Sequence, residues 1–454
     1  IWYFIGASYD ASTGRATLHQ AGVVNRYNSL WGKVTPMDYD SHVSETLRFK
    51  PKHAPDISFL VGGTWDFHAN RGKFVNELYS GKVDRPGVVS RALSREEFDH
   101  ICSGGKPPKN DILAYWDTSV GYTDTGIGDT VTDTGPHGLH AIGVNKPVRA
   151  QTGWNWNGRN DCFRLAPEEY GGIEFHDDAI IDCGWDVTHR LTIPDNLKSG
   201  VYAIRLRAGE GTGLGEEYIV FFIRAKTPRA PIALLIPTAS YLAYANDHLT
   251  FDAQMAQPIV GQTPIVSDID IEVYQSPEFG LSTYDHHQDG AGVCYSSYRR
   301  PIVSLHPKYR NPMNGVTWQF PADLSIVAWL EHCNYDYEVL TDEDLHREGV
   351  DSITPYKCVI TGTHPEYYSE TMLDATEDFV VGGGRLIYMG GNGYYWNVDF
   401  CKDEPWCMEV RKLDSGMRAW NAKPGEHYMQ TTGQKGGLWK NLGRPPQKAL
   451  GVGF

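Results

Sequence analysis

Four side chains with metal-binding or proton-transfer chemistry follow predicted strands in the C-terminal half of the chain: Tyr244, His364, Glu366 and Asn392. They lie in three segments, residues 232–247, 356–369 and 385–396, in each of which an apolar strand runs directly into a polar loop. Because open α/β sheets bind ligands outside the carboxyl ends of their strands, we expect the three loops to converge on one site.

Tyrosine and glutamate side chains at one site would favour a highly charged metal ion. Phenolate and carboxylate are hard oxygen anions, which bind hard cations better than soft ones. Two phenolates and one carboxylate would neutralise a ferric ion, and the ion would in turn keep the tyrosines deprotonated near neutral pH. A ferric ion with open positions is a Lewis acid that could polarise an amide carbonyl. The opposing interpretation is that these residues are packed aromatic side chains and an ordinary turn, and the residue types alone leave both interpretations open.

Standard hydrolase and nucleotide-binding motifs are absent from the sequence. No Gly-x-Ser-x-Gly nucleophile turn, His-Glu-x-x-His zinc helix or Walker loop occurs. A serine hydrolase of the α/β type is therefore not expected, and the tyrosine-rich set above is the main candidate site.

The elements that must position this set belong to a predicted α/β domain over residues 229–454. Strands are predicted at residues 232–236, 337–340, 357–361 and 385–389, and helices at residues 323–333 and between Ser369 and Gly382. Strands that alternate with helices indicate a parallel sheet with right-handed crossovers, and we expect a fold resembling the glutamine-amidotransferase-like folds. A long insertion at residues 247–321 is expected to fold over the strand ends as part of the site.

Two β-rich regions are predicted before this domain. Residues 1–108 resemble a concanavalin-like or laminin-G-like β-sandwich trimmed at its start, for which we expect a structural role rather than sugar binding. Residues 109–228 form a second β-rich domain, with strands predicted near residues 112–116, 172–175, 190–193 and 201–207. The glycine-rich residues 209–215 lead from a strand into another strand, so we interpret them as a hairpin turn rather than a nucleotide-binding loop.

Composition and charge narrow the class of partner. The formal net charge of −15 argues against binding to nucleic acid or to an anionic membrane surface. The sequence has no run of about 18 apolar residues, so we expect no membrane span. The eight cysteines are scattered without a C-x-x-C pair and no signal peptide opens the chain, so we expect a reduced, cytoplasmic protein, present here as part of a longer one.

Two segments resemble the large subunit of bacterial N,N-dimethylformamidase: residues 234–246 (LLIPTASYLAYAN) and residues 361–367 (TGTHPEY). Shorter matches lie at residues 169–178, 390–393 and 437–439. The resemblance therefore extends from the second β-rich region nearly to the end of the chain.

This resemblance implies a mononuclear ferric (Fe³⁺) amidohydrolase. Its iron would be held by Tyr244, Tyr284 and Glu366, although the spacing to Tyr284 differs by one residue from the family pattern. His364 would lie beside the iron and exchange a proton with water and the leaving amine, and Asn392 would be an active-site asparagine. The implied reaction converts a small N-substituted formamide to formate and an amine, and the implied assembly is a hetero-oligomer with a small partner subunit.

The sequence is also compatible with two other functions. Asp285, His286 and His287 could instead hold zinc or another divalent ion in a different hydrolase. Outside enzymology, the chain could be a carbohydrate-binding or scaffolding protein in which the sandwich carries the function.

Overall fold

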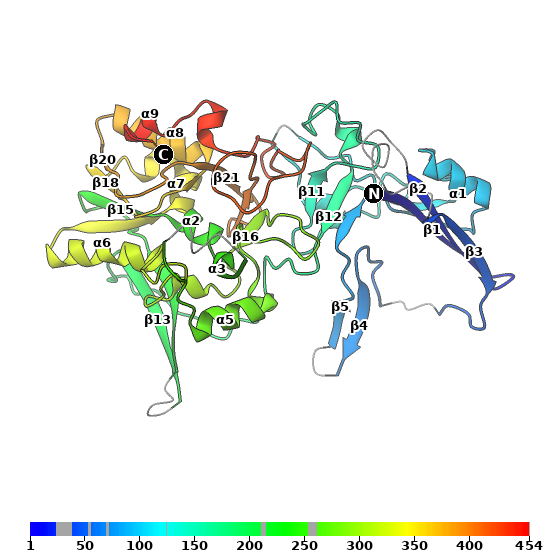
Figure 1. The fold of residues 1–454 in the computed structure, drawn as a ribbon, viewed down its shortest axis with the longest axis horizontal. Helices are drawn as coiled ribbons and strands as arrows, with labels where there is room; N and C mark the ends of the chain where they lie inside the picture. The colour runs from blue at the N-terminus through cyan, green and yellow to red at the C-terminus, as the bar shows by residue number, and fades with distance from the viewer. Residues whose placement is uncertain are drawn as a thin grey trace. The chain divides into compact units, whose positions relative to one another are not determined.

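The computed structural model describes residues 1–23, 39–52, 56–69, 72–123, 125–209, 215–252 and 261–453. The chain divides into two compact units, Ile1–Asp177 with Lys423–Gly433, and Asp178–Ala422 with Gln434–Phe454. Figure 1 shows the elements of each unit. Among the described residues, no helix has both the length and the apolar character needed to cross a membrane.

The first unit consists mainly of short antiparallel strands. Its elements are β1 (Trp2–Asp10), β2 (Arg15–Val23), β3 (Ser41–Thr46), β4 (Thr64–His68), β5 (Gly72–Asn76), β6 (Gly81–Val83), β7 (Gly87–Val89), α1 (Arg95–Cys102), β8 (Ile112–Tyr115), β9 (Thr130–Val131), β10 (Ala141–Ile142), β11 (Val148–Gln151) and β12 (Gly172–Phe175). They form three-stranded sheets in the orders β1-β2-β3 and β11-β12-β6, and the pairs β4–β5, β7–β8 and β9–β10. Helix α1 starts with a capping box at Ser94 and stacks Phe98 on the ring of His19.

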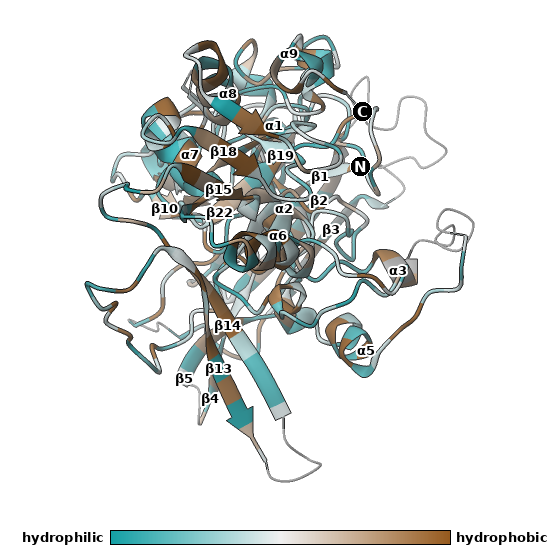
Figure 2. Ribbon diagram, turned by 90° about the vertical axis from the view of Figure 1, so that its left-hand side faces the viewer, coloured by the Kyte–Doolittle hydropathy of each residue, from teal (hydrophilic) through white to brown (hydrophobic). Residues whose placement is uncertain are grey.

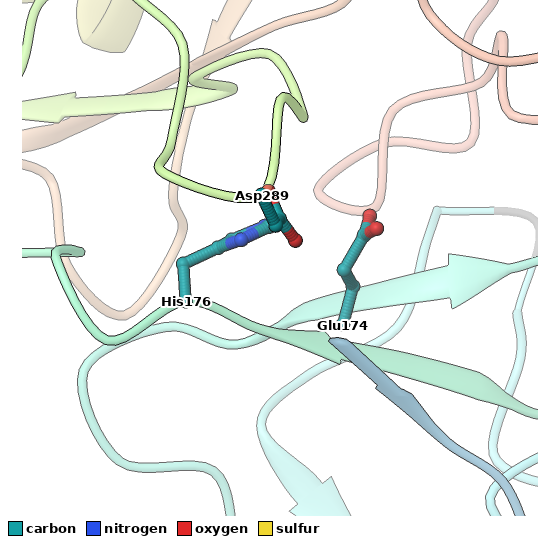
Figure 3. Close-up of side chains that lie close together, drawn as sticks. All are labelled: Glu174, His176 and Asp289. Atoms are coloured by element: carbon teal, nitrogen blue, oxygen red, sulfur yellow. The ribbon is translucent and has the colours of Figure 1, made fainter. Parts of the chain in front are cut away.

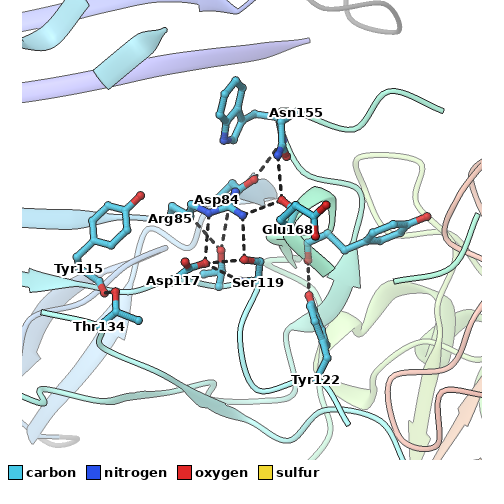
Figure 4. Close-up of polar contacts among 12 residues, drawn as sticks. Asp84, Arg85, Tyr115, Asp117, Ser119, Tyr122, Thr134, Asn155 and Glu168 are labelled. Carbon is cyan, nitrogen blue, oxygen red and sulfur yellow. Dashed lines mark hydrogen bonds and ion pairs between the residues drawn. The ribbon is translucent and has the colours of Figure 1, made fainter. Parts of the chain in front are cut away.

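Arg85 joins three parts of the first unit (Figure 4). Its backbone is left-handed, with a φ of 47°, and its guanidinium contacts Asp84 Oδ1 at 3.0 Å, Asp117 Oδ1 at 3.2 Å and Ser119 Oγ at 2.9 Å. The same group donates to the carbonyl of Glu168 at 2.7 Å. Because its guanidinium ties Asp84, Asp117, Ser119 and the Glu168 carbonyl together, we interpret the network as structural.

Strand β12 carries Glu174 and leads into His176 (Figure 3). The Glu174 carboxylate accepts a hydrogen bond from Lys423 Nζ at 2.6 Å, and Lys423 belongs to the same unit although it lies far along the sequence. This ion pair fixes the returning segment 423–433 to the sheet β11-β12-β6.

The second unit contains the expected parallel sheet. Its elements are β13 (Gly200–Ala208), β14 (Gly215–Ile223), β15 (Ile232–Ile236), α2 (Thr238–Ala243), α3 (Leu249–Asp252), α5 (Asp268–Gln275), β16 (Tyr295–Ser297), α6 (Phe320–His332), β17 (Tyr337–Thr341), α7 (Asp342–Glu348), β18 (Cys358–Thr361), β19 (Tyr367–Tyr368), α8 (Glu370–Val381), β20 (Arg385–Ile387), β21 (Trp396–Phe400), β22 (Cys407–Val410) and α9 (Gln447–Leu450). The sheet has the order β17-β15-β18-β20, and all neighbours are parallel.

Local sequence signals explain the core of this sheet. Strand β15 is apolar throughout and almost wholly buried, as expected of a strand covered on both faces (Figure 2). Its residues alternate between two core clusters, with Ala233 and Leu235 on one face and Leu234 and Ile236 on the other. Helix α8 begins at the cap residue Ser369, whose Oγ accepts from the Met372 backbone, and buries one apolar face.

A second sheet, β16-β22-β21-β19, stands beside the parallel one and was not foreseen. Strands β16, β22 and β21 are antiparallel, whereas β21 and β19 run parallel. This sheet joins the insertion at residues 247–321 to the C-terminal part of the unit.

The structure confirms a multidomain chain with many small β-sheets and a separate parallel sheet. The likeness of residues 1–108 to concanavalin or laminin-G sandwiches, the glutamine-amidotransferase-like fold and the boundaries of residues 1–108, 109–228 and 229–454 stay predictions. The strand predicted at residues 190–193 is wrong, because Leu191 and Ile193 are exposed and pair with no other strand among the described residues. Strands β13 and β14 pair antiparallel, as the hairpin interpretation requires, but residues 210–214 of the turn lie outside the described residues.

Candidate metal centre

The carboxyl ends of β15 and β18 carry two of the three predicted metal ligands. Tyr244 is the C-cap residue of α2, the short helix that follows β15, and Glu366 lies in the turn that follows β18. The Glu366 backbone N–H donates to Ser240 Oγ at 3.0 Å, which ties this turn to α2. The two side chains are therefore set by neighbouring strands of one sheet.

The insertion supplies the third predicted ligand, Tyr284. The preceding residue, Thr283, donates from both its backbone N–H (3.2 Å) and its hydroxyl (3.0 Å) to the carbonyl of Ala243, at the end of α2. This contact places Tyr284, a residue of the insertion, beside Tyr244.

The oxygen atoms of the three residues converge. Tyr244 OH donates to Glu366 Oε2 at 2.7 Å and lies 2.7 Å from Tyr284 OH, while Tyr284 OH is 3.5 Å from Glu366 Oε1. The tyrosine rings stack with centroids 4.4 Å apart. Tyr244 is 9% exposed, Tyr284 5% and Glu366 1%. The structure thus brings together two phenols and a carboxylate in a buried cluster.

His364 adjoins this cluster. Its Nε2 lies 3.0 Å from Glu366 Oε2, and its ring is buried against Trp318 with a centroid distance of 4.7 Å. On the opposite side, a side-chain carbon at position 391 would lie 3.7 Å from His364 Nδ1, so the backbone of Gly391 closely approaches the ring. His364 therefore lies at the edge of the cluster, in contact with its carboxylate.

Asn392 lies on the loop that covers His364. The Gly391 N–H donates to the carbonyl of Thr363 at 3.1 Å, and Asn392 itself has a left-handed backbone with a φ of 50°. Asn392 is half-buried and lines a cavity of about 140 Å³ together with Tyr388, Gly390, Gly391, Gly393, Leu450, Val452 and Gly453. Within the described part of the chain, no hydrogen bond joins the Asn392 side chain to the two tyrosines or Glu366.

Two further members of the site were missed by the sequence analysis. Tyr367 OH donates to Tyr284 OH at 2.8 Å and is fully buried. Lys412, also fully buried, places its Nζ 3.1 Å from the centroid of the Tyr284 ring, and this Nζ has no hydrogen-bond partner in the described residues. Burial lowers the pKa of Lys412 to about 7, and the charges of Glu366 and Asp285 oppose that shift. The run Glu366-Tyr367 could have drawn attention to Tyr367, whereas only the position of Lys412 after an apolar strand could have indicated the lysine.

The electrostatics of the cluster fit a bound cation. Burial raises the pKa of Tyr244, Tyr284 and Tyr367 well above the ordinary tyrosine value, and the negative charge of Glu366 raises each further. A hard cation would reverse both effects, because it stabilises the phenolate form and compensates the carboxylate. The convergent oxygen donors therefore match the chemistry of a hard, highly charged ion.

The alternative ligands Asp285, His286 and His287 make separate contacts. Asp285 accepts from the backbone N–H groups of Ser282 at 2.7 Å and His248 at 3.0 Å. His287 Nδ1 lies 2.6 Å from Asp178 Oδ1, and His286 is exposed. In the described residues these three side chains do not assemble around a common centre.

Comparison with known proteins gives consistent matches. Residues 148–454 match the family model described as N,N-dimethylformamidase beta subunit-like, C-terminal. The whole chain is 41% identical over 460 residues to the N,N-dimethylformamidase beta subunit of Paracoccus aminophilus, and 40% identical over 459 residues to that of an Alcaligenes species. The chain spans 59% of the length of each of these relatives. The matched subunit is named beta in each case, and its description as the large subunit stays a prediction.

Proposed function

Because this chain belongs to the family described as N,N-dimethylformamidase beta subunit-like, we propose that it hydrolyses the amide bond of a small N-substituted formamide, such as N,N-dimethylformamide, to formate and an amine. The observation that carries the proposal is the buried convergence of Tyr244, Tyr284 and Glu366, with His364 at 3.0 Å from the carboxylate. A cluster of this composition suits a metal-assisted hydrolysis.

The metal in this proposal is a single Fe³⁺ ion held by Tyr244, Tyr284 and Glu366. Its support is the donor set itself, in which two phenols and one carboxylate supply hard oxygen atoms and up to three negative charges. When bound, ferric iron would supply a Lewis acid for the carbonyl of the amide.

His364 and Asn392 have distinct roles in the proposed reaction. His364 takes a proton from the attacking water and returns it to the leaving amine, which is the role of a general base and then a general acid. The contact of its Nε2 with Glu366 orients the ring. Asn392, on the loop beside His364, donates a hydrogen bond to the oxyanion that develops on the substrate.

Lys412 and Tyr367 support the ligand Tyr284. Lys412 places its Nζ 3.1 Å from the centroid of the Tyr284 ring, where its protonated form would offset part of the negative charge of the donor set. Tyr367 donates to the Tyr284 oxygen and so orients it. Both side chains are fully buried, which keeps water from competing with these contacts.

The assembly and location are part of the same proposal. The relatives are named as beta subunits, which supports a hetero-oligomer with a second type of subunit. From the resemblance alone, this chain would belong to the larger type and its partner would be the smaller one. The proposed cytoplasmic location rests on the sequence, in which the eight cysteines are scattered without a C-x-x-C pair.

The test combines metal analysis with a product assay. The protein, purified with its partner subunit, is assayed with N,N-dimethylformamide for formate and dimethylamine, and its iron content and visible spectrum are measured. We expect stoichiometric iron, a phenolate-to-iron absorption band and release of both products. An active protein that contains zinc and lacks iron would contradict the ferric centre, and an iron-loaded protein that releases neither product would contradict the substrate class.

A further inference from the structure

Gln319 adopts a strained backbone conformation beside the candidate metal centre. Its φ of 54° and ψ of −123° lie in a region that residues with a Cβ rarely occupy. The conformation lets the Gln319 carbonyl accept the N–H groups of Ala322 and Asp323, both at 3.0 Å, and so begin α6. The side chain takes no part in capping the helix.

The side-chain amide of Gln319 is buried without a partner. The residue is 2% exposed, and neither Nε2 nor Oε1 has a hydrogen-bond partner in the described residues. Buried amides are almost always paired, because an unpaired donor or acceptor loses its hydration without compensation. No group among the described residues supplies that partner, so the amide is available to a small molecule such as a ligand or a water.

The position of Gln319 indicates which small molecule this is. Trp318 packs on the core cluster of one sheet face, whereas Phe320 belongs to the cluster of the other face. The segment 318–320 therefore crosses the carboxyl edge of the sheet, with Gln319 at the crossing. Asp323, one turn further along, accepts from the backbone N–H of Thr363, the residue before His364. Gln319 thus lies where the loops of the site meet.

Trp318 gives the same edge an apolar surface. Its ring lies 4.7 Å from that of His364 and, at a right angle, 5.7 Å from that of Tyr244. It is half-buried, so part of the ring remains free to contact a ligand. An unpaired amide and a free aromatic face next to the metal centre are complementary to a small neutral amide with alkyl groups on its nitrogen.

We propose that Trp318 and Gln319 form the substrate-recognition edge of the site. The Gln319 amide donates a hydrogen bond from Nε2 to the carbonyl oxygen of the substrate, and the Trp318 ring packs against its N-alkyl groups. This inference rests on the proposed amide hydrolysis and adds the residues that select the substrate. The strained backbone starts α6 at the next residue and leaves the buried Gln319 amide uncommitted to the helix cap.

Kinetics of matched variants test this assignment. Gln319→Met keeps the length of the side chain and removes both polar atoms, and loss of one neutral hydrogen bond is expected to raise KM for N,N-dimethylformamide roughly 10-fold. The control is Asn334→Gly at the opposite end of α6, where a left-handed residue with a φ of 52° lies just beyond the helix. The control is expected to keep the wild-type KM and kcat.

The outcomes separate this inference from the function on which it rests. A wild-type protein that does not hydrolyse the amide contradicts the proposed function and the recognition edge with it. A wild-type protein that is active, together with a Gln319→Met variant of unchanged KM and kcat, overturns the recognition edge alone.

A crystal structure of the wild-type protein with N,N-dimethylacetamide gives a second test that does not depend on folding of the variant. We expect Gln319 Nε2 within hydrogen-bond distance of the ligand oxygen and Trp318 in contact with its methyl groups. A Gln319 side chain that contacts only an ordered water and lies beyond hydrogen-bond distance of the ligand would overturn the assignment.

Discussion

Replacing Tyr244 by phenylalanine removes one hydroxyl group that has two short contacts in the candidate centre. That hydroxyl donates to Glu366 Oε2 at 2.7 Å and lies 2.7 Å from Tyr284 OH. Tyr367→Phe is the matched comparison, because it also removes a buried phenol hydroxyl. Among the three proposed ligands, the Tyr367 hydroxyl contacts only the Tyr284 hydroxyl, at 2.8 Å. The two variants differ in whether a proposed iron ligand is lost.

The structure sets the size of each effect. Without metal, Tyr244→Phe loses a hydrogen bond to a buried carboxylate, which is worth about 1.5–3 kcal/mol, whereas Tyr367→Phe loses one between neutral groups, worth about 0.5–1.5 kcal/mol. For iron, loss of an outer partner such as the Tyr367 hydroxyl lowers affinity about 10- to 100-fold. Loss of a direct anionic ligand should therefore lower it by more than about 100-fold.

The assay is iron content, the visible absorption band and urea unfolding for wild type and both variants. We expect Tyr244→Phe to lose the iron and the band, and Tyr367→Phe to keep the iron with a shifted band, because the hydrogen bond to the Tyr284 oxygen is gone. Two results would refute the reasoning: a Tyr244→Phe protein with full iron and an unchanged band, or a Tyr367→Phe protein that loses iron as completely as Tyr244→Phe.

Three further predictions concern proton transfer, pH dependence and helix capping. His364→Gln should lower kcat about 10²- to 10⁴-fold with iron retained, since a positioned general base contributes that much, and a kcat within twofold of wild type would exclude the role. Burial raises the pKa of Asp399 in the folded protein to about 7, so the folded state binds the extra proton and stability should fall as pH rises from about 4 to 7. In Asp399→Asn, the decrease in the free energy of unfolding over this pH range, measured by urea unfolding, should be smaller by at most about 4 kcal/mol. An equal dependence of the free energy of unfolding on pH in wild type and variant would contradict this prediction. Ser369→Ala should destabilise α8 by about 1 kcal/mol, because Ser369 Oγ caps the Met372 N–H, and an unchanged urea midpoint would show that the cap contributes nothing.

Local signals predicted the parallel sheet well. The apolar run at residues 232–236 forms β15 with the same limits, and the serine cap and glycine stop of the later helix correspond to Ser369 and Gly382. The start of α6 was placed too late, at residue 323 instead of Phe320. Pro321 fits the first turn of a helix, but only the left-handed conformation of Gln319 allows the helix to begin there, and a glutamine gives no sign of such a conformation.

The candidate site was predictable where it depends on single strand ends. Tyr244 ends the short helix α2 that follows β15, and Glu366 lies in the turn after β18, so the order of strands in the sheet brings the two residues close together. Tyr284 lies in an insertion without periodicity and came from the family resemblance. Tyr367 and Lys412 depend on the second sheet, since Tyr367 is in β19 and Lys412 follows β22, and pairing between such short, distant strands leaves no pattern in the sequence.

The wide sequence separation of the proposed ligands has a consequence for the maturation of the protein. Tyr244 and Glu366 are 122 residues apart in the chain, and Tyr244 and Tyr284 are 40 apart. An unfolded or nascent chain therefore offers iron no organised set of donors, and the centre can be completed only after β15 and β18 have paired and the insertion has closed over them. In the proposed ferric enzyme, iron would therefore bind at the end of folding and would stabilise the folded domain rather than start its folding.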